Sequence, residues 1–220
     1  MYKGSTLAFA SDSRVWTGNF DGSTLSNVKR VLTTQASSMS ESSLKSFGKI
    51  TAVQCLEDDA SAEDQVLVFT DSGDILQNSI VDGILTDEDW KVMSSSGVKV
   101  NDYAWLQDSS GKTLFLATSG GLMVYDQSSG QMTLASRQHT SPVSRLCVHD
   151  GKVHFGDESG AILQCGRDLK IVEFAVLYDK ITDVKIESLQ LSDGNVHKVM
   201  FAAVGSSIKW RLYDVKGHEF

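Results

Sequence analysis

The chain has 220 residues, of which 41% are hydrophobic, and it carries a net charge of −8. Its length and hydrophobic content suffice for one sizeable core and exclude a chain that is disordered throughout. The negative charge disfavours direct binding to nucleic acid, because the phosphates repel an acidic surface.

Proline, cysteine and apolar runs set further limits. Pro142 is the only proline, so no proline-rich linker marks a boundary, and we expect a single domain over residues 1–220. The three cysteines, Cys55, Cys147 and Cys165, are too few and too widely spaced for a disulfide framework. The sequence shows no secretory signal and no apolar run of membrane-spanning length. We therefore expect an intracellular protein of the cytoplasm or nucleus, without membrane insertion.

One short pattern occurs five times along the chain: an apolar run ends in small residues, crosses a Ser/Gly/Asp turn and resumes as a second apolar run. In chain order the copies are residues 7–16, 66–76, 114–124, 153–163 and 199–210. Their turns align at Ser13, Gly73, Gly121, Gly160 and Ser207, which gives spacings of 60, 48, 39 and 47 residues. A repeat of about 40–50 residues built only of short strands predicts a β-propeller.

The segments around each copy complete a four-stranded repeat. Alternating segments, typical of the inner strand of a blade, precede four of the copies at 50–56, 100–106, 143–148 and 181–186. More polar segments, typical of the solvated outer strand, lie at 89–93, 131–135 and 171–174. The first repeat opens on its second strand and the last ends on its third. We therefore expect either a ring of five blades or an incomplete ring that a partner or further sequence completes by strand addition.

A serine-rich stretch, residues 33–48, breaks the alternating pattern. Its few apolar side chains could bury little surface. We interpret it as an inserted, mobile loop that folding does not require.

One repeat resembles the WD40 family. Its residues are His139-Thr140-Ser141-Pro142-Val143-Ser144-Arg145-Leu146, then Asp150–Val153 and Gly156–Ile162. The Gly-His dipeptide of the family reads Gln138-His139 here, and its Trp-Asp ending is echoed by Tyr125-Asp126 and Tyr213-Asp214. The resemblance implies an all-β, WD40-like propeller with degenerate repeats, whose His–Ser/Thr–Asp–Trp hydrogen-bond network is complete in no copy. The segment 125–131 is also similar to a blade motif of quinoprotein-like propellers.

Two expectations concern aromatic packing. Four phenylalanines occupy near-equivalent central-strand positions and are expected to pack between blades: Phe69, Phe115, Phe155 and Phe201. Among the four tryptophans we expect core packing for most and partial exposure for Trp90, which follows three acidic residues.

The residue patterns do not favour catalysis or a bound cofactor. Cys147, His149, His154 and Cys165 are close in sequence but lack the spacing of a zinc finger or knuckle. No Gly-x-Ser-x-Gly elbow occurs, and the turn at Gly120-Gly121 has no helix behind it to bind phosphate. We expect a protein that is not an enzyme and that holds no metal and no cofactor.

The sequence therefore favours a non-catalytic scaffold for protein–protein interaction, a propeller subunit of a larger intracellular complex. The candidate partner-binding residues combine exposed aromatics with polar groups at the starts of inner strands: Trp90, Asn101, Asp102, Arg145, Asp183 and Trp210. The alternative is a small-ligand or enzymatic propeller with a polar central channel. Asp102 and Asp183, which occupy similar places in their repeats, would line such a channel.

Overall fold

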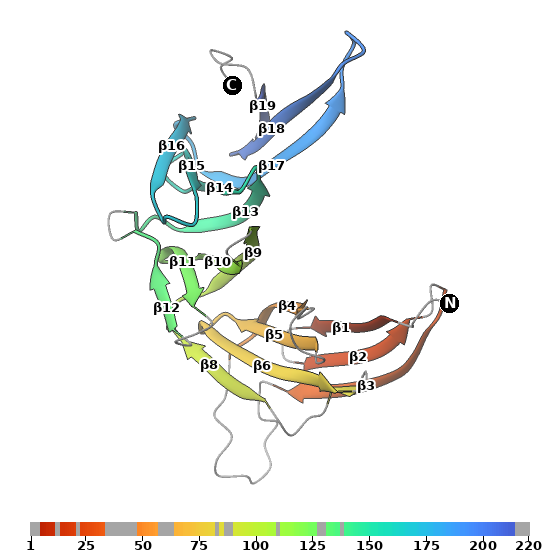
Figure 1. Cartoon of the computed structure of the whole chain (residues 1–220). Helices are drawn as coiled ribbons and strands as arrows, with labels where there is room; N and C mark the ends of the chain where they lie inside the picture. The colour runs from red at the N-terminus through yellow and green to blue at the C-terminus, as the bar shows by residue number, and fades with distance from the viewer. Residues whose placement is uncertain are drawn as a thin grey trace. The chain divides into compact units, whose positions relative to one another are not determined.

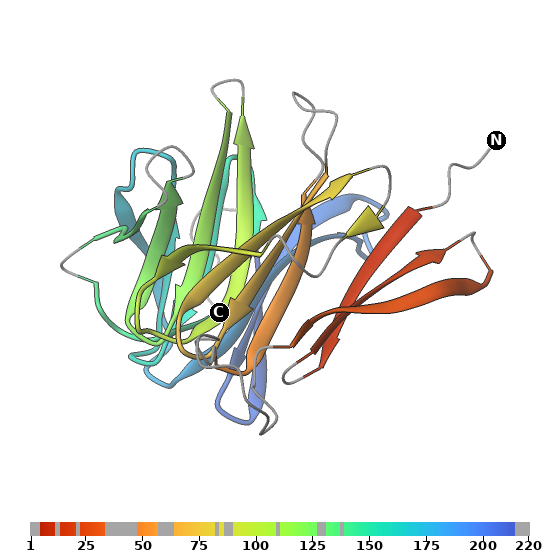
Figure 2. The same cartoon turned by 90° about the horizontal axis from the view of Figure 1, so that it is seen from below.

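The structure is a computed structural model. It describes residues 5–11, 14–20, 23–33, 48–56, 64–81, 84–85, 90–108, 111–126, 131–136 and 139–213. Within these ranges all the regular secondary structure is β-strand (Figures 1 and 2). No helix of the length and hydropathy needed to cross a membrane occurs among them.

The strands form antiparallel sheets that follow one another in chain order (Figure 1). The first sheet has the order β1 (Ser5–Ser11), β2 (Arg14–Phe20), β3 (Leu25–Thr33). The second sheet has the order β4 (Ile50–Leu56), β5 (Asp64–Thr70), β6 (Asp74–Val81), and β6 also pairs with β7 (Ile84–Leu85) and β8 (Lys91–Ser95). These two sheets belong to the first of two compact units, residues 1–100.

The second compact unit, residues 101–220, holds three more sheets. The third sheet is β9 (Val100–Asp108), β10 (Gly111–Thr118), β11 (Gly121–Asp126), β12 (Gln131–Leu134). The fourth sheet is β13 (Val143–His149), β14 (Lys152–Asp157), β15 (Ala161–Cys165), β16 (Ile171–Val176). The fifth sheet is β17 (Ile181–Gln190), β18 (Val196–Val204), β19 (Ser207–Leu212).

These sheets confirm the predicted order of inner, central and outer strands. The predicted strands 50–56, 100–106, 143–148 and 181–186 are the first strands of the second to fifth sheets. The sequence missed β3, the outer strand of the first sheet, and β7, a two-residue strand. Thr33, assigned to the serine-rich insertion, is the last residue of β3; residues 34–47 of that insertion lie outside the described residues. The single-domain organisation stays a prediction.

Apolar side chains between consecutive sheets form the cores of each unit. In the first unit, Val15 and Val31 of the first sheet pack with Val66, Val68 and Leu76 of the second. In the second unit, one buried cluster joins the third and fourth sheets and another joins the fourth and fifth. The fourth sheet is therefore apolar on both faces.

The glycines at three predicted turns lie directly against the backbone of the loop that leads from the last strand of their own sheet to the next sheet. A Cβ atom at Gly73 would lie 2.5 Å from the oxygen of Val98, and one at Gly121 would lie 2.8 Å from the oxygen of His139. At Gly160 it would lie 2.7 Å from the nitrogen of Asp179. All three glycines have positive φ. Glycine is required at these turns because a side chain would displace backbone.

The residue that begins each of these turns is buried and polar. The Thr118 hydroxyl donates to the oxygen of Gly121 at 2.7 Å and accepts from the nitrogen of Gly120 at 3.1 Å. Asp157 takes the same place in the fourth sheet and accepts hydrogen bonds from Ser159 and from the Ala161 nitrogen. These side chains satisfy turn donors that would otherwise be left unpaired in the core.

Asp157 also links the third and fourth sheets. Its Oδ2 atom lies 2.9 Å from Nε2 of His139, which follows β12. Burial alone would raise the pKa of Asp157, but the hydrogen bonds from Ser159, His139 and Ala161 outweigh it and the pKa lies below the usual value of 3.8.

The predicted equivalence of the four phenylalanines is wrong in register. Phe115 and Phe201 lie three residues before the turn residues Thr118 and Val204, whereas Phe155 lies two residues before Asp157. Phe155 therefore faces the third sheet, on the opposite side of its own strand, because a one-residue shift reverses the side chain. Phe69, Phe115 and Phe155 are all fully buried, but Phe201 is only half-buried.

Candidate protein-binding surface

The two faces of the fifth sheet differ in burial. Met200, Ala202 and Val204 of β18 are buried against the fourth sheet. On the other face, Phe201 pairs with Trp210 and Ala203 pairs with Ile208 of β19. We call these four residues, Phe201, Ala203, Ile208 and Trp210, the fifth-sheet face.

Equivalent positions in the preceding sheets are buried. The pair Ala203–Ile208 corresponds to Ala117–Leu122 in the third sheet and to Gly156–Ile162 in the fourth. Leu122 and Ile162 are fully buried against the sheet that follows, whereas Ile208 is 71% exposed and Trp210 is 53% exposed. The fifth-sheet face thus has the composition of an inter-sheet contact and the exposure of a surface. Exposed apolar patches of this kind mark interaction sites.

Charged side chains border this face on β17. Asp183 pairs across the sheet with Ala203, and Lys185 pairs with Phe201. Nζ of Lys185 lies 2.6 Å from Oε1 of Glu187. An apolar centre with a charged, solvated rim is the usual anatomy of a protein interface.

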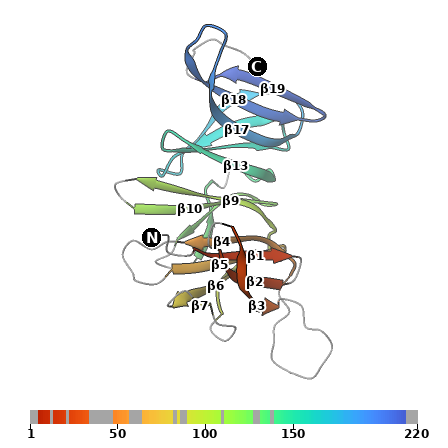
Figure 3. The ribbon, with the colours of Figure 1, turned by 90° about the vertical axis from the view of Figure 1, so that its right-hand side faces the viewer.

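Polar candidates from the sequence gather on the first strands of the third, fourth and fifth sheets, β9, β13 and β17 (Figure 3). Nδ2 of Asn101 donates to the oxygen of Val143 at 2.8 Å. Oδ2 of Asp102 accepts from the nitrogen of Leu146 at 3.0 Å, and its Oδ1 lies 3.8 Å from the guanidinium of Arg145.

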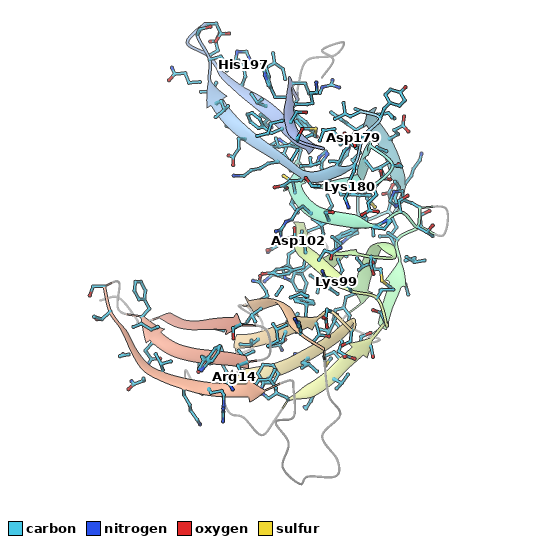
Figure 4. The ribbon with its side chains drawn as sticks, turned by 180° about the vertical axis from the view of Figure 1, so that it is seen from behind. Arg14, Lys99, Asp102, Asp179, Lys180 and His197 are labelled. Carbon is cyan, nitrogen blue, oxygen red and sulfur yellow. The ribbon has the colours of Figure 1, made fainter. Side chains whose placement is uncertain are left out.

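The electrostatics of this group centre on Asp102, which projects from β9 (Figure 4). Burial raises the pKa of Asp102 above 3.8, the Leu146 hydrogen bond and Arg145 oppose that effect, and the charge of Asp183 adds to it. Asp102 therefore interacts with Arg145 and with the charge of Asp183. More than half of the Arg145 side chain is exposed, so its remaining donors can reach a partner carboxylate.

The two candidate tryptophans lie in different surroundings. Trp90 is half-buried in the first unit, packs on the core of that unit and donates to the oxygen of Val31 at 2.9 Å. Trp90 is partly exposed, as expected, but Trp210 is 53% exposed and is the more exposed of the two. The acidic residues before Trp90 suggested a solvated segment, but the indole nitrogen finds a backbone acceptor on β3.

One cysteine and two histidines of the fourth sheet, Cys165, His149 and His154, are engaged in packing. Cys165 is buried in the core between the third and fourth sheets. His154 is fully buried, its Nε2 atom lies 3.2 Å from the hydroxyl of Tyr213, and Phe174 and Tyr213 stack beside it. Burial, together with the charge of His149, lowers the pKa of His154 to about 4. The described residues contain no group of three or more His, Cys, Asp or Glu arranged to hold a metal ion.

Sequence reasoning missed Ile208 and Phe201 as surface residues. Both lie in apolar runs that look like core strand. The signal that bears on them is the alignment of Ala203 and Ile208 with Ala117 and Leu122, which places these residues on the face that carries inter-sheet contacts in the third sheet.

No protein-family model and no curated protein matches the chain. Solved structures do match it. BBS1N, crystallised in complex with ARL6DN, is 15% identical with a TM-score of 0.64, over 97% of this chain and 62% of that one. Sqt1 of Saccharomyces cerevisiae is 12% identical with a TM-score of 0.61, over 98% and 57%. The extracellular domain of BT4673 from B. thetaiotaomicron is 15% identical with a TM-score of 0.57, over 95% and 26%.

At these identities the similarity concerns the fold. BBS1N and Sqt1 are β-propeller proteins, and the successive antiparallel sheets of this chain share their fold. The chain spans less than two thirds of the length of the matched structures.

Proposed function

We propose that the chain is a non-catalytic, WD40-like scaffold for protein–protein interaction, a subunit of a larger complex in the cytoplasm or nucleus. The observation that carries the proposal is the fifth-sheet face, where positions that are buried in the third and fourth sheets are exposed. The BBS1N structure, a propeller fold in complex with a protein, supports this kind of role.

The geometry suggests how a partner binds. Among the described residues, β11 and β15 each pair with an outer strand, whereas β19 pairs only with β18. A partner strand beside β19 would complete that sheet by β-augmentation. Its apolar side chains would cover Ile208 and Trp210. Asp102, Arg145 and Asp183 would contribute polar contacts that set specificity.

A charge placed on the fifth-sheet face tests the proposal. Ile208→Asp should abolish binding of stoichiometric partners in a quantitative pull-down, because a buried, unpaired carboxylate costs several kcal/mol. Val172→Asp on β16 is the matched control, since Val172 is also an exposed β-branched residue. A chain that is otherwise wild type and carries a photo-crosslinking residue in place of Trp210 identifies the protein that contacts the fifth-sheet face.

The outcomes separate clearly. A crosslink to a partner that Ile208→Asp loses and Val172→Asp keeps supports the scaffold. Equal recovery with both variants, or a wild-type chain that remains a monomer without partners, contradicts it. A crosslink to a second copy of the chain would replace the proposal with self-association.

The polar-channel alternative has no observation of its own in its favour. Asp102 already accepts from Leu146 and faces Arg145. We therefore do not propose it.

A further inference from the structure

The turn between β16 and β17 presents an aromatic ring to solvent. Tyr178 is 90% exposed, the highest value among the large hydrophobic residues described. Its backbone has a φ of 58°, in the left-handed region. That region is disfavoured for residues with a side chain, and bulky residues rarely occupy it.

Contacts below the turn explain how this conformation is held. A Cβ at Gly160 would lie 2.9 Å from the nitrogen of Tyr178, so the absence of a side chain lets the turn rest directly on β14–β15. The nitrogen of Leu177 donates to the oxygen of Gly160 at 2.8 Å. The backbone is thus fixed from below while the ring gains little packing. Residues held in such strained conformations cluster at binding sites.

Charged groups surround the turn. Asp179 and Lys180 follow Tyr178 directly (Figure 4), and Lys180 forms an ion pair with Glu158 of the β14–β15 turn. Oδ1 of Asp179 accepts from the nitrogen of Lys180 at 2.7 Å. All three charged side chains are exposed. Two carboxylates against one ammonium give the turn a net negative charge, in a chain whose net charge is −8.

We propose that Tyr178, Asp179 and Glu158 form a recognition site for an arginine side chain in a basic segment of a partner protein. The guanidinium would stack on the exposed ring, and its N–H groups would bond to a carboxylate of these two turns. Arginine fits better than lysine because its planar group can stack and bond at once. Arg211, whose guanidinium lies 4.9 Å from the ring centre of Phe174, forms such a stack within this chain. The site lies on the β14–β15 and β16–β17 turns, and it shares no residue with the fifth-sheet face.

Titration of the isotope-labelled full chain by NMR tests this inference. The probe is a short Gly/Ser peptide with one central arginine, and the matched control peptide carries citrulline, which keeps the shape and removes the charge. We expect the arginine peptide to shift the backbone amides of residues 158–160 and 177–180. The citrulline peptide should leave those amides unchanged.

Variants distinguish the contribution of the Tyr178 ring to peptide binding from that of the charged side chains. Tyr178→Gly suits the left-handed backbone and should weaken binding by about fivefold, within the range expected for one cation–π contact. Tyr178→Phe keeps the ring and should bind as the wild type does. Glu158→Lys should weaken binding further in low salt. Protection of the Leu177 amide from hydrogen exchange verifies that the turn is intact in each variant.

Three results would overturn the inference: equal binding of the citrulline peptide, undiminished binding by Tyr178→Gly, or amide shifts confined to other surfaces. Trp210→Ala, on the fifth-sheet face, should leave the titration unchanged. If it abolishes the shifts instead, the peptide binds the fifth-sheet face and the turn is not the site.

Discussion

Replacement of Gly160 by alanine should destabilise the second unit more than an ordinary glycine substitution does. The residue has a φ of +90°, and its added Cβ would lie 2.7 Å and 2.8 Å from the nitrogen and oxygen of Asp179. Both neighbours are backbone atoms, which cannot rotate away. Relief of the overlap would have to move the whole β16–β17 turn.

The magnitude follows from two contributions. The left-handed backbone costs alanine about 1–2 kcal/mol, and overpacking of a tight contact costs roughly 1–3 kcal/mol more. We expect a loss of about 2–5 kcal/mol in the free energy of unfolding. For a chain of this size, each kcal/mol lowers Tm by about 2–4 °C.

Gly151→Ala is the matched control. Gly151 also has a positive φ, +69°, but its Cβ would meet no atom within 4 Å. This variant should show only the backbone contribution of about 1–2 kcal/mol. Urea unfolding of both variants gives the comparison, and hydrogen exchange at the Leu177 amide reports the turn itself. Equal losses in the two variants would refute the argument that backbone contact requires glycine at residue 160.

Three further predictions concern buried polar groups. Burial lowers the pKa of His154 from 6.5 to about 4, so the side chain stays neutral in the folded state while it gains a proton in the unfolded state. The free energy of unfolding should therefore fall by about 3 kcal/mol as the pH drops from 6.5 to 4. His154→Phe should remove this pH dependence in urea titrations, and the same pH dependence in both proteins would contradict the prediction. Because the pKa of Asp157 is lowered in the folded state, its charged form stabilises the fold above the usual carboxyl pKa, and that stability is lost as the pH falls below it. Asp157→Asn should therefore weaken the dependence of unfolding free energy on acidic pH. An unchanged dependence would contradict this. Thr118→Val leaves the nitrogen of Gly120 without its acceptor and should cost about 1–3 kcal/mol, measured by thermal unfolding; a neutral result would mean that water replaces the hydroxyl.

The strands could be predicted because alternation and turn residues are local signals. Each predicted copy consists of two strands joined by a tight turn, and the sheets are built from neighbours along the chain. The register between repeats was harder, because the turns differ in length. From Gly156 to Ile162 the fourth sheet uses more residues than the third uses from Ala117 to Leu122. That difference displaced Phe155 by one position.

The candidate surface depended on information that no single strand contains. In the sequence, apolar residues such as Ile208 look like core residues. Only the packing of one sheet against the next shows which face of a sheet is covered. Asp102 and Arg145 were named as candidates because they lie near the starts of inner strands, and their role in binding stays a prediction. Tyr178 was not found, because nothing in the letters Leu-Tyr-Asp-Lys indicates a left-handed backbone; that conformation depends on Gly160, far from it in sequence.

Two of the hydrogen bonds described above bear on the speed of folding. The sheets themselves form from hairpins, whose short loops close at low entropic cost. By contrast, Trp90 to Val31 and Tyr213 to His154 each join residues 59 positions apart, one bond in each unit. We expect these two long-range hydrogen bonds to form after the rate-limiting step of folding. Trp90→Phe and Tyr213→Phe should therefore leave the refolding rate nearly unchanged and accelerate unfolding. The resistance of the native state to transient opening would then be set by these two late contacts rather than by the hairpins.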